Sequence, residues 1–287
     1  MKLNLSDILT NWHEMPLDEQ PKLIKTFTAG LNHETHLVQS ANKQYVLKLF
    51  QQAEPRAITV QRWAADHGLA PEIFYANQRR DIVLMDYLAT ETINRSDINQ
   101  NTLKMLATAL RRLHELPGSE LADDIGQFDL LEFCKTYLKQ IDASDTLSQQ
   151  IYTQLLPVLT IFTQDNTPYC ICHNDLVTAN CFVVGDAQKQ KALFIDWEYA
   201  QLHNPWFDLT AIIYYFELSA DEAQFFLNQY RNGWASKFGT PIEVAAQISL
   251  LWGDMLWHLA RGGWSAWPNL EKKLADLRQL ALKLELI

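Results

Sequence analysis

The chain has 287 residues, of which 48% are hydrophobic and 20% charged, so it can bury one large core or two smaller ones. Its net charge of −10 argues against a nucleic-acid partner and would favour the approach of a cationic substrate. Residues 1–12 lack the basic and apolar regions of a signal peptide, and no apolar run reaches membrane-spanning length. We therefore expect a cytoplasmic protein without membrane insertion.

Short segments of β character dominate the chain up to about residue 90. Five strands are predicted, at residues 22–28, 33–39, 44–50, 71–77 and 81–87. One helix is expected between the third and fourth strands, because Glu54-Pro55 suits a helix start and Gly68 suits a left-handed helix end. This pattern predicts an N-terminal lobe, residues 1–90, built as an antiparallel sheet with one helix.

Helices dominate beyond that point. They are predicted for residues 96–113, 130–141 and 147–162, for two segments that open with capping boxes at Ser219 and Thr240, and for a last segment from Asn269. Pro157 implies a kink or break in its helix. Short strands are expected at residues 169–173, 181–184 and 192–195. The chain as a whole is therefore predicted to have an α+β fold of two lobes, with a mainly helical C-terminal lobe at residues 91–287.

The segment from His173 to Glu198 carries the clearest functional signal. It contains His173-Asn174-Asp175, then Asn180, then a short apolar strand and Asp196. The carboxylate of Asp175 is suited to take the proton of an attacking hydroxyl, while Asn180 and Asp196 offer the hard oxygen ligands that Mg²⁺ prefers. We expect His173 to orient the loop rather than to act as the base. The pattern predicts an ATP-dependent small-molecule kinase that uses Mg²⁺.

Four further positions are predicted to bind the nucleotide. Lys48 alternates with apolar neighbours on a strand and would hold the α- and β-phosphates. Gly30 lies between two strands, where a turn could cover phosphates, although an ordinary hairpin explains it equally well. The backbone near Met85 and Tyr87, at the end of an apolar strand, would bind adenine. Neither a Walker A sequence nor G-x-G-x-x-G occurs.

Several assignments stay open at the level of sequence. Glu54 either reaches back to Lys48 or leaves it without a glutamate partner. Glu198 could touch a second metal or the substrate, or cap the following turn. Asp208 could accept backbone N–H groups of the catalytic loop or be a plain acid at a helix start.

The four cysteines are Cys134, Cys170, Cys172 and Cys181. Cys170 and Cys172 would point to the same face of a strand, but the spacing of the four matches no common zinc motif. We expect buried, reduced thiols beside a catalytic loop.

A family resemblance rests on three segments. The chain carries His173-Asn174-Asp175-Leu176 with Asn180, then Phe194-Ile195-Asp196-Trp197-Glu198-Tyr199-Ala200, then Phe207-Asp208-Leu209. With Leu113-His114-Glu115-Leu116, this resembles the choline/ethanolamine kinase family within the aminoglycoside-phosphotransferase-like superfamily. Bacterial thiamine kinases are similar in layout and share the Ile-Asp-Trp-Glu-Tyr-Ala segment. The resemblance implies a protein-kinase-like two-lobe fold and phosphorylation of a hydroxyl on a small molecule.

Substrate identity is expected to depend on the C-terminal helices. Trp252, Trp257 and Trp264 gather there with Asp254, and tryptophan faces attract organic cations. A core role is the alternative, because Trp252 follows the helical spacing of apolar residues. Choline or ethanolamine is the first expectation, with thiamine or an aminoglycoside as alternatives and an inactive nucleotide-binding module as a different class. A monomer or a homodimer is expected.

Overall fold

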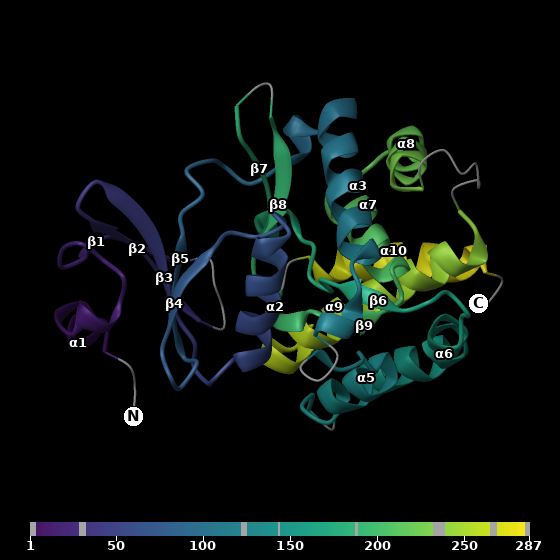
Figure 1. Cartoon of the computed structure of the whole chain (residues 1–287). Helices are drawn as coiled ribbons and strands as arrows, with labels where there is room; N and C mark the ends of the chain where they lie inside the picture. Colours follow the sequence, from purple (N-terminus) through teal and green to yellow (C-terminus); the bar gives the residue numbers. More distant parts are fainter. Residues whose placement is uncertain are drawn as a thin grey trace. The chain divides into compact units, whose positions relative to one another are not determined.

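The computed structural model describes residues 4–28, 33–121, 125–142, 144–186, 189–231, 239–264 and 269–284. The chain forms two compact units (Figure 1). Unit 1 comprises Met1–Ile93, Ser119–Ile125 and Ala179–Ala200, whereas unit 2 comprises Asn94–Gly118, Gly126–Thr178 and Gln201–Ile287. The chain therefore returns to unit 1 twice after residue 93, and a lobe boundary at residue 90 stays a prediction.

Unit 1 is built on a five-stranded antiparallel sheet. Its strands are β1 (Lys22–Phe27), β2 (Glu34–Ser40), β3 (Lys43–Leu49), β4 (Ile73–Ala76) and β5 (Ile82–Asp86). They lie in the order β1-β2-β3-β5-β4, and every neighbouring pair is antiparallel. The structure thus confirms the predicted antiparallel sheet, with each strand close to its predicted range.

Both faces of this sheet are covered by apolar side chains. On one face, Tyr45, Leu47 and Leu49 of β3 pack with Ile8 of the short helix α1 (Leu5–Thr10), which was not predicted. On the other face, Ile58 of α2 (Pro55–Asp66) packs with Val83 and Met85 of β5. Helix α2 begins and ends as predicted, since it starts at Pro55 and is followed by Gly68 with a φ of +68°.

A second, smaller sheet of unit 1 is the hairpin of β7 (Cys181–Val184) and β8 (Lys191–Phe194). The backbone N–H of Phe194 donates to the carbonyl of Leu69, 2.9 Å away, just after α2. This bond connects the hairpin to the segment that follows α2.

Unit 2 is mainly helical. Its helices are α3 (Gln100–Glu115), α5 (Leu130–Leu138), α6 (Thr146–Thr163), α7 (Trp206–Tyr215), α8 (Ala220–Tyr230), α9 (Pro241–Gly262) and α10 (Leu270–Lys283). Helix α9 is the centre of the packing, because α5, α6, α7 and α10 all contact it (Figure 1). Two short strands, β6 (Cys170–Cys172) and β9 (Gln201–His203), pair antiparallel within this unit.

Two predicted features of the helices differ from the structure. Helix α3 begins at Gln100 rather than near Ser96, because the Asn99 side chain accepts the N–H groups of Asn101 and Thr102 and caps the helix there. Helix α6 continues through Pro157 as one element, so the predicted break is absent, whereas a kink at Pro157 stays a prediction.

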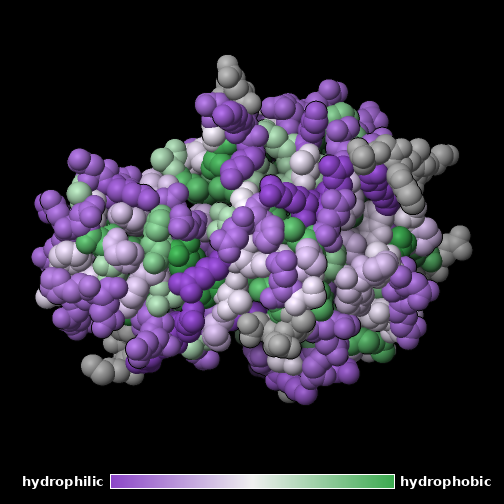
Figure 2. Space-filling model, in the orientation of Figure 1, coloured by the Kyte–Doolittle hydropathy of each residue, from purple (hydrophilic) through white to green (hydrophobic). Residues whose placement is uncertain are grey.

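The remaining regular elements are single turns of 3₁₀ helix. They are η1 (Trp12–Glu14), η2 (Arg95–Asp97), η3 (Gly118–Glu120), η4 (Thr178–Asn180) and η5 (Trp197–Tyr199). Among the helices that the structure describes, none has the length and apolar character needed to span a membrane. Hydrophilic side chains cover most of the face drawn in Figure 2, with smaller hydrophobic areas between them.

Candidate active site

The β7–β8 hairpin brings the two predicted metal ligands of unit 1 to one end of its ladder. The first residue of β7, Cys181, pairs with the last residue of β8, Phe194. One step beyond, the N–H of Ile195 donates to the carbonyl of Asn180, 3.0 Å away. Asn180, just before β7, and Asp196, just after β8, therefore lie at the same end of the hairpin. An amide oxygen and a carboxylate at this place can bind one cation.

Asp196 has an unusual backbone conformation. Its φ of +67° lies in the left-handed region, which aspartate tolerates better than most residues. This conformation ends the extended chain of β8 and starts the turn η5. The strand-to-turn change thus places the carboxylate of Asp196 directly after a buried strand.

Lys48 of β3 is brought to Asp196, 148 residues further along the chain. Its Nζ lies 2.7 Å from Oδ1 of Asp196, with the lysine side chain 12% exposed and the aspartate side chain 33% exposed. Because residues alternate along a strand, Lys48 shares the face of β3 with Val46, opposite Leu47 and Leu49. The ammonium and the carboxylate form one polar group at the surface of unit 1.

Glu54 lies close to this pair without forming a salt bridge to Lys48 in the described part of the chain. Burial raises the pKa of the Glu54 carboxyl, and the charge of Glu198 raises it further. His33, Arg56 and Lys48 lower the pKa of Glu54, but their effects are smaller. The structure therefore assigns Asp196, and not Glu54, as the carboxylate that Lys48 pairs with.

Glu198 lies in a surface pocket of about 270 Å³ in the same unit. Its Oε2 is 2.7 Å from Nε2 of His33, and its backbone carbonyl accepts a hydrogen bond from Arg56, 3.0 Å away. Neither His33 nor Arg56 was predicted from the sequence, because their partner is more than 140 residues away. The lining residues are His33, Gln51, Gln52, Glu54, Arg56, Glu198 and Tyr199.

The three predicted nucleotide positions besides Lys48 have different outcomes. Met85 is buried in β5, where Val46 is its partner across the sheet and Gln61 donates to its sulfur. Tyr87 follows the strand and is partly buried. Gly30 lies outside the described residues. The adenine and phosphate-loop assignments stay predictions.

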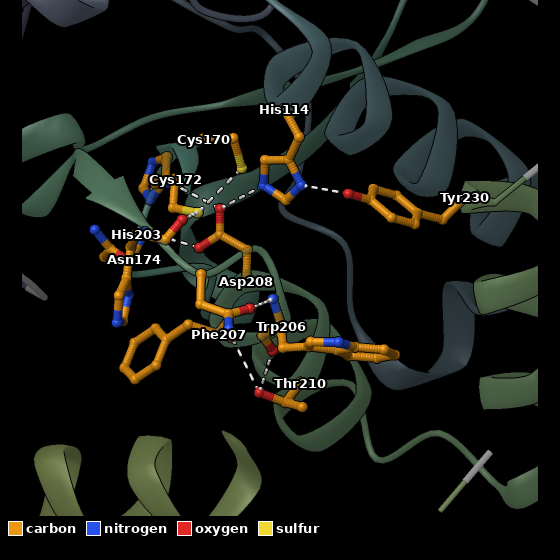
Figure 3. A network of polar contacts seen from close by, with 12 residues as sticks. His114, Cys170, Cys172, Asn174, His203, Trp206, Phe207, Asp208, Thr210 and Tyr230 are labelled. Atoms are coloured by element: carbon orange, nitrogen blue, oxygen red, sulfur yellow. Dashed lines mark hydrogen bonds and ion pairs between the residues drawn. The ribbon is translucent and has the colours of Figure 1, made fainter. Parts of the chain in front are cut away.

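In unit 2, the backbone of the catalytic loop is held by Asp208 near the start of α7 (Figure 3). Oδ2 of Asp208 accepts the N–H of His173 and Oδ1 accepts the N–H of Asn174, each at 2.8 Å. Of the two alternatives for Asp208, the structure therefore confirms the one in which it accepts backbone N–H groups of that loop. Asn174 has a φ of +64°, and its side-chain oxygen accepts a hydrogen bond from Nδ1 of His203, 2.8 Å away.

The charge of Asp208 is completely buried and is balanced by His114 of α3. Burial by itself would raise the pKa of Asp208, but the hydrogen bond and charge of His114 hold it below its usual range. Burial would likewise lower the pKa of His114, but Cys170 and Asp208 raise it above the ordinary value. Nε2 of His114 is 3.2 Å from Asp208, and Nδ1 is 2.8 Å from the hydroxyl of Tyr230. The loop anchor is thus a buried ion pair.

The two residues predicted for chemistry in this loop differ in exposure. His173 is completely buried, which fits an orienting role. Asp175 is partly exposed, and it lies near the phenol of Tyr215 at the end of α7. Burial raises the pKa of Tyr215 far above its usual value, and the charges of Asp254 and Asp175 raise it further. Tyr215, which no sequence signal marked, therefore lies beside both carboxylates.

Of the predicted substrate residues of α9 and the following turn, Asp254, Trp257 and Trp264 have partners inside unit 2. Trp252 is completely buried, as the core alternative expects. Asp254 forms ion pairs with Lys273 and His258, and the guanidinium of Arg261 lies 3.7 Å from the ring centre of Trp257. Nε1 of Trp264 donates to Asp145, 2.8 Å away. A substrate role for these residues stays a prediction.

Comparison with known proteins gives the family. Residues 23–238 match the phosphotransferase enzyme family (APH). This match covers most of the chain, so the chain belongs to that family. Among curated proteins, it is 28% identical to Protein LicA of Haemophilus influenzae over 206 residues, which are 67% of this chain and 72% of that protein.

Solved structures show the same fold. Choline kinase LicA from Streptococcus pneumoniae superposes with a TM-score of 0.70 at 18% identity, over 92% of this chain and 94% of that one. A choline/ethanolamine kinase family protein from Mesorhizobium loti also has a TM-score of 0.70 at 18% identity, over 96% and 94%. Spectinomycin phosphotransferase APH(9)-Ia, solved with ADP and spectinomycin, has a TM-score of 0.66 at 16% identity over 100% of both chains. The predicted protein-kinase-like fold is confirmed.

Proposed function

We propose that this phosphotransferase transfers the γ-phosphate of ATP to the hydroxyl of a small cationic alcohol, with choline or ethanolamine as the first candidates. The main support for this chemistry comes from the end of the β7–β8 hairpin. Asn180 and Asp196 both lie there, and Nζ of Lys48 is 2.7 Å from Oδ1 of Asp196. Carboxylate, amide and ammonium groups are the set that a magnesium nucleotide requires.

Magnesium fits the donors that unit 1 offers. Asn180 and Asp196 would supply hard oxygen ligands, and Asp196 already has a cation, the ammonium of Lys48, at 2.7 Å. When bound, Mg²⁺ would neutralise negative charge on the phosphates. The soft thiolate ligands in unit 2 are poor magnesium ligands, so they do not compete for this ion.

The other roles fall to side chains of the chain itself. Lys48 would bind the α- and β-phosphates, and the backbone near Met85 and Tyr87 would bind adenine. Asp175 would accept the hydroxyl proton of the alcohol and orient its oxygen toward the phosphate. His173 and Asn174, held through their N–H groups by Asp208, would keep the carboxylate of Asp175 in place. Orientation of this kind is a main source of catalysis in phosphoryl transfer.

The choice of alcohol rests on the LicA relatives. The curated relative is Protein LicA, and a solved relative of the same name is a choline kinase. The net charge of −10 favours a cationic substrate over an anionic one. The face of Trp257 binds a cation in the structure, the guanidinium of Arg261, and an organic cation could use the same ring.

The test is an ATP-consumption screen of the purified protein with Mg²⁺ against choline, ethanolamine, thiamine, homoserine and kanamycin. We expect turnover on choline or ethanolamine. Asp175→Asn is the matched control, because it keeps the size of the side chain and removes its basicity, and it should lower the rate by about 10²- to 10⁴-fold. Turnover on thiamine or kanamycin alone would replace the substrate assignment. Nucleotide binding without turnover on the whole panel would support the inactive nucleotide-binding module.

A second experiment tests the aromatic site. Trp257→Ala should raise KM for the preferred alcohol by about 30-fold while kcat changes little, because a desolvated cation–π contact is worth about 2 kcal/mol. Leu282→Ala, at an exposed position of α10, is the control for removal of a large apolar side chain. An unchanged KM in Trp257→Ala would remove that residue from the substrate site.

A further inference from the structure

A histidine and two cysteines form a cluster in unit 2 that phosphoryl transfer does not use. The cluster contains His114, Cys170 and Cys172, and one ligand atom from each lies within 4.8 Å of the others. His114 comes from the last turn of α3, whereas both cysteines belong to β6. The cysteine spacing alone matched no zinc motif, because the third member is 56 residues before Cys170 in the sequence.

The geometry of the two sulfurs follows from the strand. Residues i and i+2 of an extended strand point to the same face, and the Sγ atoms of Cys170 and Cys172 lie 3.7 Å apart. Two thiolates bound to tetrahedral zinc, at about 2.3 Å each, are separated by about 3.8 Å. The observed spacing therefore equals an edge of a zinc tetrahedron without any movement of β6.

The imidazole of His114 is oriented for the same purpose. In Figure 3 the ring edge with Nε2, the nitrogen bonded to Asp208, also faces Cys170. The other nitrogen, Nδ1, is hydrogen-bonded to the hydroxyl of Tyr230 at 2.8 Å. Metal-binding histidines usually use one nitrogen for the metal and the other for a hydrogen bond that fixes the ring. Tyr230 supplies that bond.

The cluster is also accessible. His114 and Cys170 line a cavity of about 660 Å³ within unit 2, together with Tyr169, Tyr230 and Arg231. Cys172 lies behind them and is completely buried. An ion can therefore enter from the cavity, and the cavity leaves space for a solvent molecule as the fourth ligand.

We propose that Nε2 of His114 and the thiolates of Cys170 and Cys172 form a site for a thiophilic divalent ion of the Zn²⁺ type. Binding releases to solvent the thiol protons of Cys170 and Cys172 and the proton on Nε2 of His114. It replaces the hydrogen bond from His114 to Asp208, but Asp208 keeps the N–H groups of His173 and Asn174. The site is thus separate from the magnesium ligands and is linked to the catalytic loop through Asp208.

The test is a titration of the metal-free, reduced full-length protein with Co²⁺, followed by displacement with Zn²⁺. We expect one equivalent of Co²⁺ to produce thiolate-to-cobalt charge-transfer absorption, which Zn²⁺ removes. Tyr230→Phe removes a hydrogen bond to a metal ligand and should lower the affinity for Co²⁺ by about 10-fold. Cys170→Ser and Cys172→Ser each remove a ligand and should lower this affinity by at least about 10- to 100-fold. Cys134→Ala and Cys181→Ala are the matched controls and should keep the absorption.

A second measurement needs no variant and does not depend on kinase activity. Zn²⁺ should protect Cys170 and Cys172 of the wild-type protein from alkylation, as peptide mass spectrometry can detect, and leave Cys134 and Cys181 unaffected. Absence of charge-transfer absorption, or its retention in both serine variants, would overturn the proposal, as would alkylation of Cys170 at an equal rate with and without Zn²⁺.

Discussion

Two ion pairs, one in each unit, hold the residues assigned to catalysis, and they differ in exposure. Lys48 and Asp196 in unit 1 lie 2.7 Å apart, and their side chains are 12% and 33% exposed. His114 and Asp208 in unit 2 lie 3.2 Å apart, and their side chains are 3% and 0% exposed. The first pair can open toward solvent or phosphate, whereas substitution of either side chain of the second leaves the other as a buried charge.

The difference in exposure indicates that the pair of unit 1 acts in activity and the pair of unit 2 in stability. A pair that must open for a ligand gains from partial exposure, since water can solvate each group when the other leaves. A buried pair is costly to break, because the remaining charge has no water to replace its partner. We therefore expect variants of Asp196 and Lys48 to affect activity, and variants of Asp208 to affect stability first.

The largest effect is expected for Asp208→Asn. The amide can no longer accept both backbone N–H groups of the catalytic loop, and His114 loses its negative partner, so the free energy of unfolding should fall by about 3–5 kcal/mol. Chemical denaturation measures it. Asp86→Asn, at the exposed pair with Lys43, is the control and should cost less than about 1 kcal/mol. Equal losses of unfolding free energy in the two variants would show that the buried pair is no more important for stability than the exposed one.

A nearly equal effect, but on activity, is expected for Asp196→Asn. The rate of phosphoryl transfer should fall by about 10³-fold, or about 4 kcal/mol, because a charge aimed at the reacting phosphates is removed. The free energy of unfolding should change by less than about 1 kcal/mol, since this carboxylate is partly exposed. A loss of stability as large as that of Asp208→Asn would contradict the assigned division of roles.

The buried surroundings of the catalytic loop also predict a pH dependence. Burial lowers the pKa of His203 to about 4, below the value of about 6.5 in an unfolded chain. The unfolded state then binds the proton first, so stability is lost as pH falls from about 6.5 to about 4, by about 3 kcal/mol in total. His203→Asn keeps an N–H donor for Asn174 and should remove this part of the slope, as denaturation at several pH values can show.

The control for that prediction is His13→Asn, because His13 is exposed. Its stability should follow the wild-type curve across the same pH range. If His203→Asn also follows that curve, the loss of stability in acid has another origin.

The smallest effect is expected for the stability of Lys48→Met. Asp196 can be solvated when the ammonium is gone, so the free energy of unfolding should change by less than about 1 kcal/mol. Lys43→Met, on the same strand and in an exposed pair with Asp86, is the matched control. A destabilisation of several kcal/mol confined to Lys48→Met would show that the pair of unit 1 is structural as well.

Local patterns predicted the elements of unit 1 well. Alternating residues in β3 and β5, and Pro55 and Gly68 around α2, act within a few residues, so their ranges agreed with the structure. The predicted start of α3 was less accurate, because the side chain of Asn99, and not that of Ser96, caps the helix. Strand β9 was not predicted from the sequence.

The candidate site was predicted only in part. Asp175, Asn180, Asp196 and Lys48 were marked by their spacing and chemical type, and the acceptor role of Asp208 was one of two alternatives. The partners His33, Arg56 and Tyr215 were not marked. They are ordinary residue types, and their importance depends on neighbours far away in the sequence.

The sequence by itself indicated most of the secondary structure, the family and the chemical type of the groups proposed for catalysis, because these depend on spacing over a few residues. Tertiary structure alone decided that Lys48 pairs with Asp196, that His114 neutralises Asp208, and that His114 lies beside Cys170 and Cys172. Each of these joins groups at least 56 residues apart in the sequence. Burial and electrostatic pairing select such partners only after the chain has folded, so no local pattern contains them.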